Sequence, residues 1–391
     1  MKITDIRTIR LRYPYEKMIA DGLSCCSARE ALLVIIETDA GLSGLGECAA
    51  FGANMNALSA IIEEQLKPLL TGEDPTIIEK LWLKMTWNNF ANGRRGIIKA
   101  AISGIDIALW DLLGKSAGLP VSRLLGAVTD KVEGYASAGF YAEEKSLDDL
   151  KREIEGYLNK GYSAFKMKVG RTDRNYRMPL RFMKQGSWLY TREADEKRVE
   201  TVRSMLDKDH ILMLDMNGTW NLEDVLDAED FFTENHIYMI EEPIRSDDID
   251  GYAKLASELK HVRIAGVESE QGLDRYRQFL EASALDVVQV NLGWSGGFTE
   301  CRKIAALSQA YDRLFTPHTF FSAVLTAANV QFAASQYNVP FIESEENFNP
   351  LRTDLLKTPI ACDEHMNYLV PQEPGLGIEL NWDVAERYAV K

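Results

Sequence analysis

The chain has 391 residues, 26% charged and 46% hydrophobic, which is ordinary for a soluble globular enzyme and excludes a disordered or fibrous protein. The length suits two domains, and the formal net charge of −15 argues against nucleic-acid or anionic-membrane partners. No apolar run approaches the ~20 residues that span a bilayer and no secretory signal opens the chain, so we expect a cytoplasmic location. The five cysteines are scattered without CxxC spacing, which predicts reduced thiols.

The first predicted elements are three antiparallel strands at residues 2–13, 30–39 and 43–49, with a glycine turn between the last two. Helical periodicity follows from about residue 56 to 115. Residues 1–125 are therefore predicted to form an α+β domain. The tail, residues 361–391, fits neither a strand nor a helix repeat, and we expect it to return to this domain.

Eight short β-rich runs alternate with helix-length segments between residues 126 and 360. The runs are 132–139, 164–170, 211–217, 237–243, 262–269, 285–292, 314–319 and 341–346. This pattern predicts a closed parallel barrel whose strand ends form the active face. An open doubly wound sheet is the alternative, but no GxGxxG motif follows the first run and no P-loop is present.

Two lysines, Lys166 and Lys168, lie in the second run and share one face, because alternate residues of a strand point the same way. The apolar residues between and beside them indicate that the other face is packed. Alone, such a pair is typical of two solvated side chains, since lysine is almost never buried without a partner.

Three carboxylates, Asp215, Glu241 and Glu268, end three successive runs and are expected to converge at one barrel mouth. Unneutralised, they would raise one another's pKa, and a divalent cation removes that repulsion. All-oxygen ligands favour Mg²⁺, with Mn²⁺ next. Any one of them alone is more typical of a surface acid at a helix N-terminus, but the regular recurrence favours the metal site.

Neighbouring polar residues supply the rest of this predicted metal site. Glu242 faces away from Glu241 and is expected behind it, while Asn217 shares the face of Asp215 and is expected to orient a ligand or water. Glu268 and Glu270 share a face, so alternation does not separate them. We favour Glu268 because it directly follows the strand-like RIAGV.

Asn291, His318 and Glu343 continue around the predicted barrel, one run each. A single histidine on a β-run is more often structural, but the strand-end place of His318 favours catalysis. Glu343 is either a salt-bridged rim residue or a proton-sharing contact to a substrate carboxylate.

The segments AFKMKVG, LDMN, IEEP, IAGVE, SGGFTEC and TPHTF resemble, in order and spacing, the mandelate racemase-like branch of the enolase superfamily. The match extends to GLSGLGE near the N-terminus and to GLGIEL in the tail. The resemblance implies a capping domain over a modified TIM barrel, (β/α)7β, an essential Mg²⁺, a small-molecule carboxylate substrate and a homo-oligomer. The lactonizing branch is less similar, because its base lysine on the sixth strand has no counterpart in VVQVNLGW.

The resemblance also implies roles for the residues. Lys168 is expected to take the proton next to the substrate carboxylate, its pKa lowered towards ~7 to 8 by Lys166 and the metal, with Lys166 adding a cation at the carboxylate. Relatives pair the histidine with an aspartate where this chain has Asn291. A neutral amide sets the tautomer of His318 without raising its basicity, which favours His318 as an acid.

These roles favour an acid-sugar dehydratase that acts through an enediolate and loses the β-hydroxyl as water, because dehydration needs one base and one acid. A racemase or epimerase is the alternative, and a metal-dependent acid-binding protein without turnover is a third. Residues 16–28 and 50–57 are expected to set specificity, with no obvious arginine clamp. The insertion at 171–193 either covers the mouth, reaches a neighbouring subunit or is a surface excursion.

Overall fold

A computed structural model describes residues 1–51, 55–172 and 190–390 of the chain. Its first layer is an antiparallel sheet in the order β3-β2-β1-β5, formed by β1 (Ile3–Ala20), β2 (Cys25–Thr38), β3 (Ser43–Cys48) and β5 (Tyr141–Ala142). The three predicted strands are present. However, β1 and β2 run further than predicted, because their pairing resumes beyond an irregularity after Pro14 and continues to Ala20 opposite Cys25.

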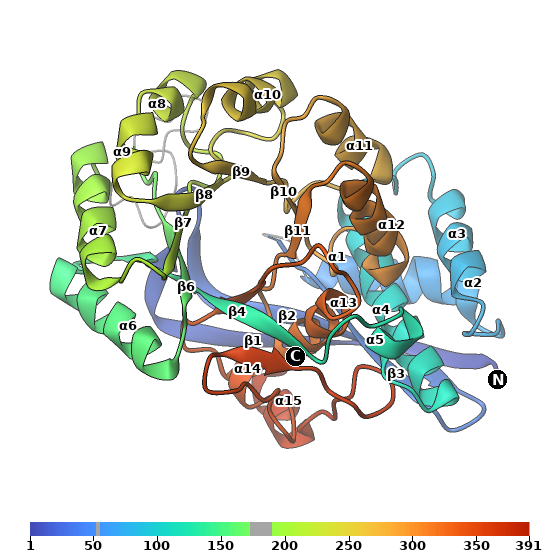
Figure 1. Cartoon of the computed structure of the whole chain (residues 1–391). Coiled ribbons are helices and arrows are strands. Elements are labelled where there is room, and N and C mark those ends of the chain that lie inside the picture. The colour runs from blue at the N-terminus through green and yellow to red at the C-terminus, as the bar shows by residue number, and fades with distance from the viewer. Residues whose placement is uncertain (52–54, 173–189, 391) are drawn as a thin grey trace.

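Helices cover this sheet beside the barrel (Figure 1). They are α1 (Met55–Ala60), the π-helix η1 (Ile61–Leu66), α2 (Lys67–Leu70), α3 (Ile78–Asn88), α4 (Ile97–Ala117) and α5 (Val121–Leu124). Helix α4 is buried along most of its length and crosses β3 closely. Glycines permit this approach, because a Cβ at Gly46 or Gly104 would clash with the facing element.

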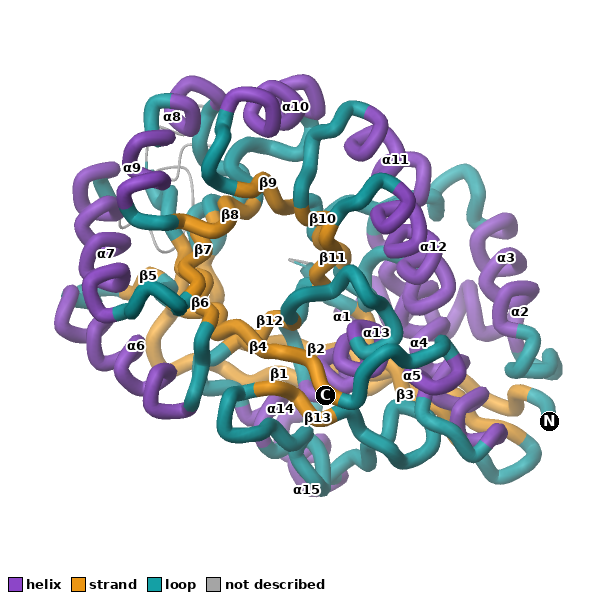
Figure 2. Tube along the Cα trace, in the orientation of Figure 1, coloured by secondary structure: helices purple, strands orange, loops and turns teal. Residues whose placement is uncertain are grey.

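Eight parallel strands form a nearly closed barrel, as the sequence predicted (Figure 2). They are β4 (Lys131–Ala138), β6 (Ala164–Lys168), β7 (Ile211–Asp215), β8 (Ile237–Glu241), β9 (Arg263–Gly266), β10 (Val287–Val290), β11 (Leu314–Pro317) and β12 (Ile342–Glu345). The hydrogen-bonded order runs from β11 back through β6 to β4 and β12. The doubly wound alternative is therefore wrong.

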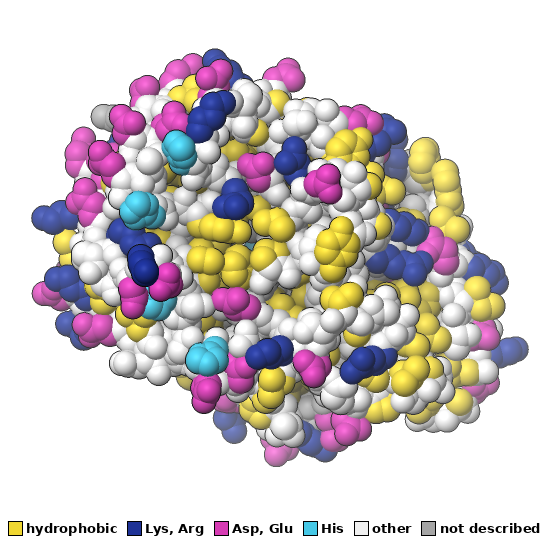
Figure 3. Space-filling model, viewed as in Figure 1, with side chains coloured by type: hydrophobic (Ala, Val, Ile, Leu, Met, Phe, Trp, Pro, Cys, Tyr) yellow, Lys and Arg dark blue, Asp and Glu magenta, His cyan; other side chains and the backbone are white. Residues whose placement is uncertain are grey.

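The barrel is a packed core. Hydrophobic side chains fill its centre in the space-filling view (Figure 3). One buried cluster draws a residue from nearly every strand, including Tyr135, Met213 and Met239. Such layers of side chains are what close a small parallel barrel.

The barrel helices form an outer ring. They are α6 (Leu147–Lys160), α7 (Arg192–Met205), α8 (Leu222–Leu226), α9 (Glu229–Glu234), α10 (Ile249–Glu258), α11 (Leu273–Glu281), α12 (Gly297–Ala310), α13 (Ala323–Ala333) and α14 (Pro350–Thr353). Local sequence sets their ends: Ser146 and Asp149 make a capping box at the start of α6, and Gly161 ends it in a left-handed conformation. Among the described residues, no helix combines the length and apolarity needed to cross a membrane.

The tail corrects one expectation, because it contains regular elements. β13 (Asn367–Leu369) pairs antiparallel with β4, and α15 (Trp382–Tyr388) packs on β1. These elements are too short to produce a recognisable period in the sequence. The Val390 N–H donates to the Arg10 carbonyl at 2.8 Å, so the end of the chain touches the N-terminal sheet. Of the predicted insertion, residues 173–189 lie outside the described part.

Glu47 on β3 joins the sheet to the barrel. Its carboxylate accepts hydrogen bonds from the Ser322 N–H at 3.1 Å, the Ser322 hydroxyl at 2.5 Å and the Leu325 N–H at 2.9 Å, all at the start of α13. Burial raises the Glu47 pKa from 4.5 to about 7, although these hydrogen bonds oppose the rise.

A Glu47→Gln variant tests this link through its pH dependence. A folded-state pKa above the unfolded value contributes stability that is fully present below about pH 4.5 and is lost as pH rises through about 7. The free energy of unfolding of the wild type, relative to Glu47→Gln, should therefore fall by about 2 kcal/mol between pH 5.5 and 8. Denaturant melts across this range measure it, and a constant difference would contradict the raised pKa.

Candidate active site

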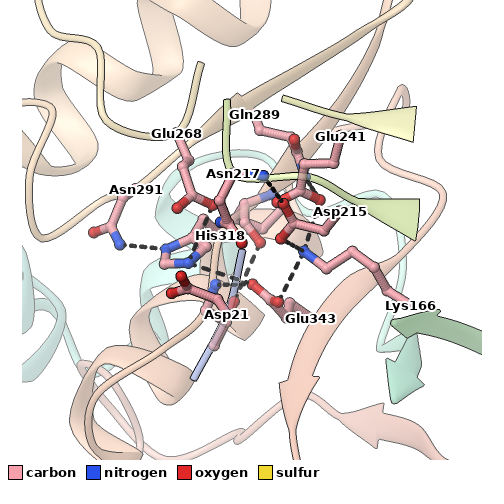
Figure 4. A network of polar contacts seen from close by, with 12 residues as sticks. Asp21, Lys166, Asp215, Asn217, Glu241, Glu268, Gln289, Asn291, His318 and Glu343 are labelled. Atoms are coloured by element: carbon pink, nitrogen blue, oxygen red, sulfur yellow. Dashed lines mark hydrogen bonds and ion pairs between the residues drawn. The ribbon is translucent and has the colours of Figure 1, made fainter. Parts of the chain in front are cut away.

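The polar residues predicted from the sequence meet at the carboxyl end of the barrel (Figure 4). Asp215 and Glu241 are the last residues of β7 and β8, and Glu268 follows β9 by two residues. Asn291 and His318 directly follow β10 and β11. Glu343 lies inside β12, as it lay inside the predicted run 341–346.

The two lysines of β6 are buried. Lys166 is 1% exposed and Lys168 4%. The Lys166 Nζ lies 2.6 Å from Glu241 Oε2, 3.0 Å from Glu343 Oε1 and 3.6 Å from Asp215 Oδ2. Lys168 forms an ion pair with Asp215. The solvated-lysine interpretation is therefore wrong, and each ammonium has the buried partner that its charge requires.

Carboxylates raise the pKa of both lysines in the chain without a metal. Burial opposes the charge on both lysines, but Glu241 and Glu343 raise the pKa of Lys166 well above its usual value. For Lys168 the Asp215 carboxylate likewise outweighs burial and the nearby Lys166, so the Lys168 pKa is raised. The predicted lowering towards neutrality includes the charge of a bound metal and stays a prediction, whereas in the chain alone the direct Asp215 contact raises the pKa of Lys168.

The carboxylates divide into two pairs. Burial raises the pKa of Glu241 and Glu268 well above the usual range, and the nearby Asp215 raises both further. Burial also opposes ionisation of Asp215 and Glu343, but Lys168 and Lys166 hold the pKa of Asp215 to about 2, and Lys166 and His318 hold that of Glu343 to about 2. The site thus contains more buried carboxyl groups than its two lysines can neutralise if all four are ionised.

Across the described residues, no three His, Cys, Asp or Glu side chains are arranged to hold a metal ion as they stand. Lysine ammoniums occupy one oxygen each of Asp215 and Glu241. The donor set nevertheless fits a hard cation: Glu241 Oε1 and Glu268 Oε2 are buried without a hydrogen-bond partner, and both are carboxylate oxygens.

His318 has a defined orientation. Its Nδ1 lies 2.7 Å from Asn291 Nδ2, and its Nε2 lies 3.2 Å from Glu268 Oε2. The ring stacks on Phe320 and Phe51 at centroid distances of 5.1 and 5.5 Å. Burial lowers the His318 pKa to about 4. Because Nδ1 accepts from Asn291, the proton of the neutral ring lies on Nε2, which faces the carboxylates.

Two further predicted residues lie close behind. The Asn217 N–H donates to Asp215 Oδ1 at 3.0 Å, and Asn217 Oδ1 accepts from the Gly22 N–H at 3.4 Å, which ties the cap to the barrel. Burial, followed by the charges of Asp215 and Glu241, raises the Glu242 pKa to about 8. Glu343 is fully buried, so the rim alternative for it is wrong.

A cavity of about 340 Å³ lies between the cap and this cluster. Both segments that were expected to set specificity contribute to its lining, although residues 52–54 lie outside the described part. On the barrel side the cavity is lined by Lys168, Asn217, Glu268 and His318, and on the cap side by residues that include Asp21, Ser24, Cys26, Arg29 and Phe51.

Sequence reasoning missed three residues here. Gln289 donates through Nε2 to Glu241 Oε2 at 2.6 Å, and its shared face with Asn291 could have revealed it. The Tyr135 ring lies 5.3 Å from the Lys166 Nζ. Arg29 also lines the cavity, and the sequence analysis did not consider it because it lies one residue beyond the segment 16–28.

Lysines and carboxylates that converge at the carboxyl end of a parallel barrel, beneath an α+β cap, define the class of capped barrel enzymes. The chain belongs to the mandelate racemase and muconate lactonizing enzyme family. The family's N-terminal domain model matches residues 9–126, and the model described as enolase C-terminal domain-like matches residues 149–384. The resemblance to the enolase superfamily and the (β/α)7β fold are thereby confirmed.

Characterised relatives span the whole chain. The arabinonate dehydratase of Saccharolobus solfataricus is 34% identical over 393 residues, covering 100% of both chains. The D-galactarolactone cycloisomerase of Agrobacterium fabrum is 30% identical over 398 residues, covering 99% of each. The structure of a racemase from Streptomyces coelicolor with bound magnesium has a TM-score of 0.86 and 29% identity, covering 99% of this chain and 100% of that one. These relatives support an enzyme.

Proposed function

We propose that this protein is an Mg²⁺-dependent dehydratase of a hydroxylated carboxylic acid, an acid sugar. The observation that carries the proposal is the unequal pair of proton-handling groups on one cavity, Lys168 and His318. The Nδ1 of His318 accepts a hydrogen bond from the neutral amide of Asn291, which fixes the tautomer without making the ring a strong base. Dehydration needs one base and one acid, whereas two-way racemisation needs two residues that each do both tasks. The 34% identity to an arabinonate dehydratase supports the same reaction class.

Asp215, Glu241 and Glu268 would hold the Mg²⁺, with Mn²⁺ as the second choice, because their oxygens suit a hard cation. When bound, the ion supplies positive charge that favours the negative charge developing on the substrate carboxylate. The relative of known structure with bound magnesium supports this assignment. Gln289 holds one oxygen of Glu241 and so orients that ligand.

The chain's own residues then handle the protons. Lys166, held by Glu241 and Glu343, keeps a fixed cation where a substrate carboxylate would lie. Lys168 accepts the α-proton at Nζ as the free amine, which requires that its ion pair with Asp215 opens and that the ammonium first loses a proton to solvent. His318 acts as the acid in its imidazolium form, after it has taken up a second proton: it donates the Nε2 proton to the departing β-hydroxyl, which leaves as water, and the ring returns to neutral. The product is an enol, which becomes a 2-keto acid.

A racemase or epimerase is the second candidate. The same cavity has Lys168 and His318 on its lining, and a relative of known structure is a racemase. In this reading His318 returns a proton to the α-carbon and the hydroxyl stays.

Proton NMR in deuterated buffer with Mg²⁺, applied to a panel of acid sugars, tests the proposal. We expect at least one substrate to lose its β-hydroxyl and give a 2-keto acid. Deuterium uptake at the α-carbon with inversion and no dehydration would favour the epimerase. If acids bind saturably but none exchanges its α-proton, the protein binds acids without turnover.

A further inference from the structure

Arg29 is a buried cation whose hydrogen bonds are incomplete. It lies on β2 of the cap, is 6% exposed and lines the cavity that also contains Lys168 and His318. Its Nε and Nη2 are buried and make no hydrogen bond, although Nη2 forms an ion pair with Glu345. A buried guanidinium with unused N–H donors is costly, so a ligand that accepts from it would be bound favourably.

The position of Arg29 places it away from the reacting groups. Its guanidinium carbon lies 4.6 Å from the centre of the Phe320 ring, and the Lys168 Nζ lies 5.8 Å from the same centre. The His318 ring stacks on Phe320 at 5.1 Å. Arg29 is therefore one aromatic ring away from the proton-handling residues, on the cap side of the same cavity.

Glu345 neutralises this arginine. Its Oε1 lies 3.3 Å from Arg29 Nη2, and the carboxylate is 1% exposed on the last strand of the barrel. Both Glu345 oxygens lack a hydrogen bond. A second carboxylate on a ligand would reach Arg29 only against the repulsion of Glu345, whereas a hydroxyl or other neutral oxygen can accept from Arg29 without it.

We propose that Arg29 binds a hydroxyl oxygen at the end of the substrate remote from the reacting carboxylate, and that Glu345 makes this end of the cavity select monocarboxylate acid sugars over dicarboxylates. The inference rests on the proposed acid-sugar function and names its substrate class. Arg29 is thus a specificity residue from the cap, and Glu345 positions it and sets its net charge.

The test compares aldonates and aldarates of five and six carbons with a short three-carbon hydroxy acid. Dissociation constants are measured by calorimetry with Mg²⁺, and kcat/KM is measured wherever turnover occurs. Arg29→Met should weaken the five- and six-carbon aldonates by about 10- to 100-fold and leave the three-carbon acid unchanged, because a hydrogen bond to a charged group is lost only with the longer ligands. Arg29→Lys should restore part of the loss.

Glu345→Gln should shift selectivity towards aldarates by about 10-fold, because Arg29 then has an uncompensated charge. Arg7→Met is the matched control: Arg7 lies on β1 of the same sheet, is not among the residues that line the cavity and is paired with Glu37 at 3.3 Å, so selectivity should not change. Thermal melts show whether each variant is folded, and Arg29→Lys replaces Arg29→Met if the latter is not.

Two results would overturn the inference: equal losses of Arg29→Met on short and long acids, or an unchanged aldonate-to-aldarate ratio in Glu345→Gln. Neither result would contradict the proposed dehydratase function. Conversely, the wild type could bind aldonates selectively and dehydrate none of them. That result would contradict the proposed function but would still support the role of Arg29 in binding.

Discussion

Lys168→Met is expected to abolish both dehydration and exchange of the substrate α-proton with solvent deuterium. Lys168 lines the cavity and is the amine nearest to Asp215, whereas Lys166 is held by Glu241 and Glu343. Methionine fills a similar volume but cannot accept a proton. Removing a positioned base typically costs about 10²- to 10⁴-fold in rate, which places the variant near the detection limit.

His318→Asn is the informative partner of this variant. It removes the acid while Lys166 and Lys168 remain, so dehydration should fall by about 10²- to 10⁴-fold while slow α-proton exchange persists. Lys151→Met, an exposed lysine on α6, serves as the control and should behave as wild type. Proton NMR in deuterated buffer gives both readouts. If His318→Asn loses exchange while Lys168→Met keeps it, the two roles are inverted.

Asp215→Asn is expected to remove Mg²⁺ binding and with it all activity. The wild type should gain thermal stability with Mg²⁺, by about 2.7 kcal/mol at a free concentration of 100 times the dissociation constant, since the ion binds only the folded chain. Asp215→Asn removes one of the three carboxylates at the strand ends, so this gain should disappear. Chelation of the wild type should likewise abolish activity.

Calorimetric titration of the metal separates this loss from a folding defect. Asp209→Asn is the matched control, because Asp209 is an exposed aspartate just before the same strand. Its Mg²⁺ affinity should match wild type. An Asp215→Asn protein with undiminished affinity would mean that the ion binds elsewhere.

The sequence determined where the strands lie and which residues share their faces. All eight barrel runs are strands, because a strand's period of two and the spacing of βα units are local properties of the chain. The same periods brought Lys166, Asp215 and Glu241 to one end of one barrel, since parallel strands place their carboxyl ends together. The strand of the tail was not predicted, because β13 spans only Asn367–Leu369 and is too short to show a period.

Tertiary structure alone decided which charges touch. The Lys168 contact with Asp215 raises the lysine pKa in the chain without a metal, and the Gln289 contact with Glu241 joins residues 48 positions apart. The Arg29 pair with Glu345 joins the cap to the last barrel strand. Pair energies and pKa shifts depend on distances of a few ångströms and on local burial, and side chains from remote segments acquire both only when the cap closes over the barrel.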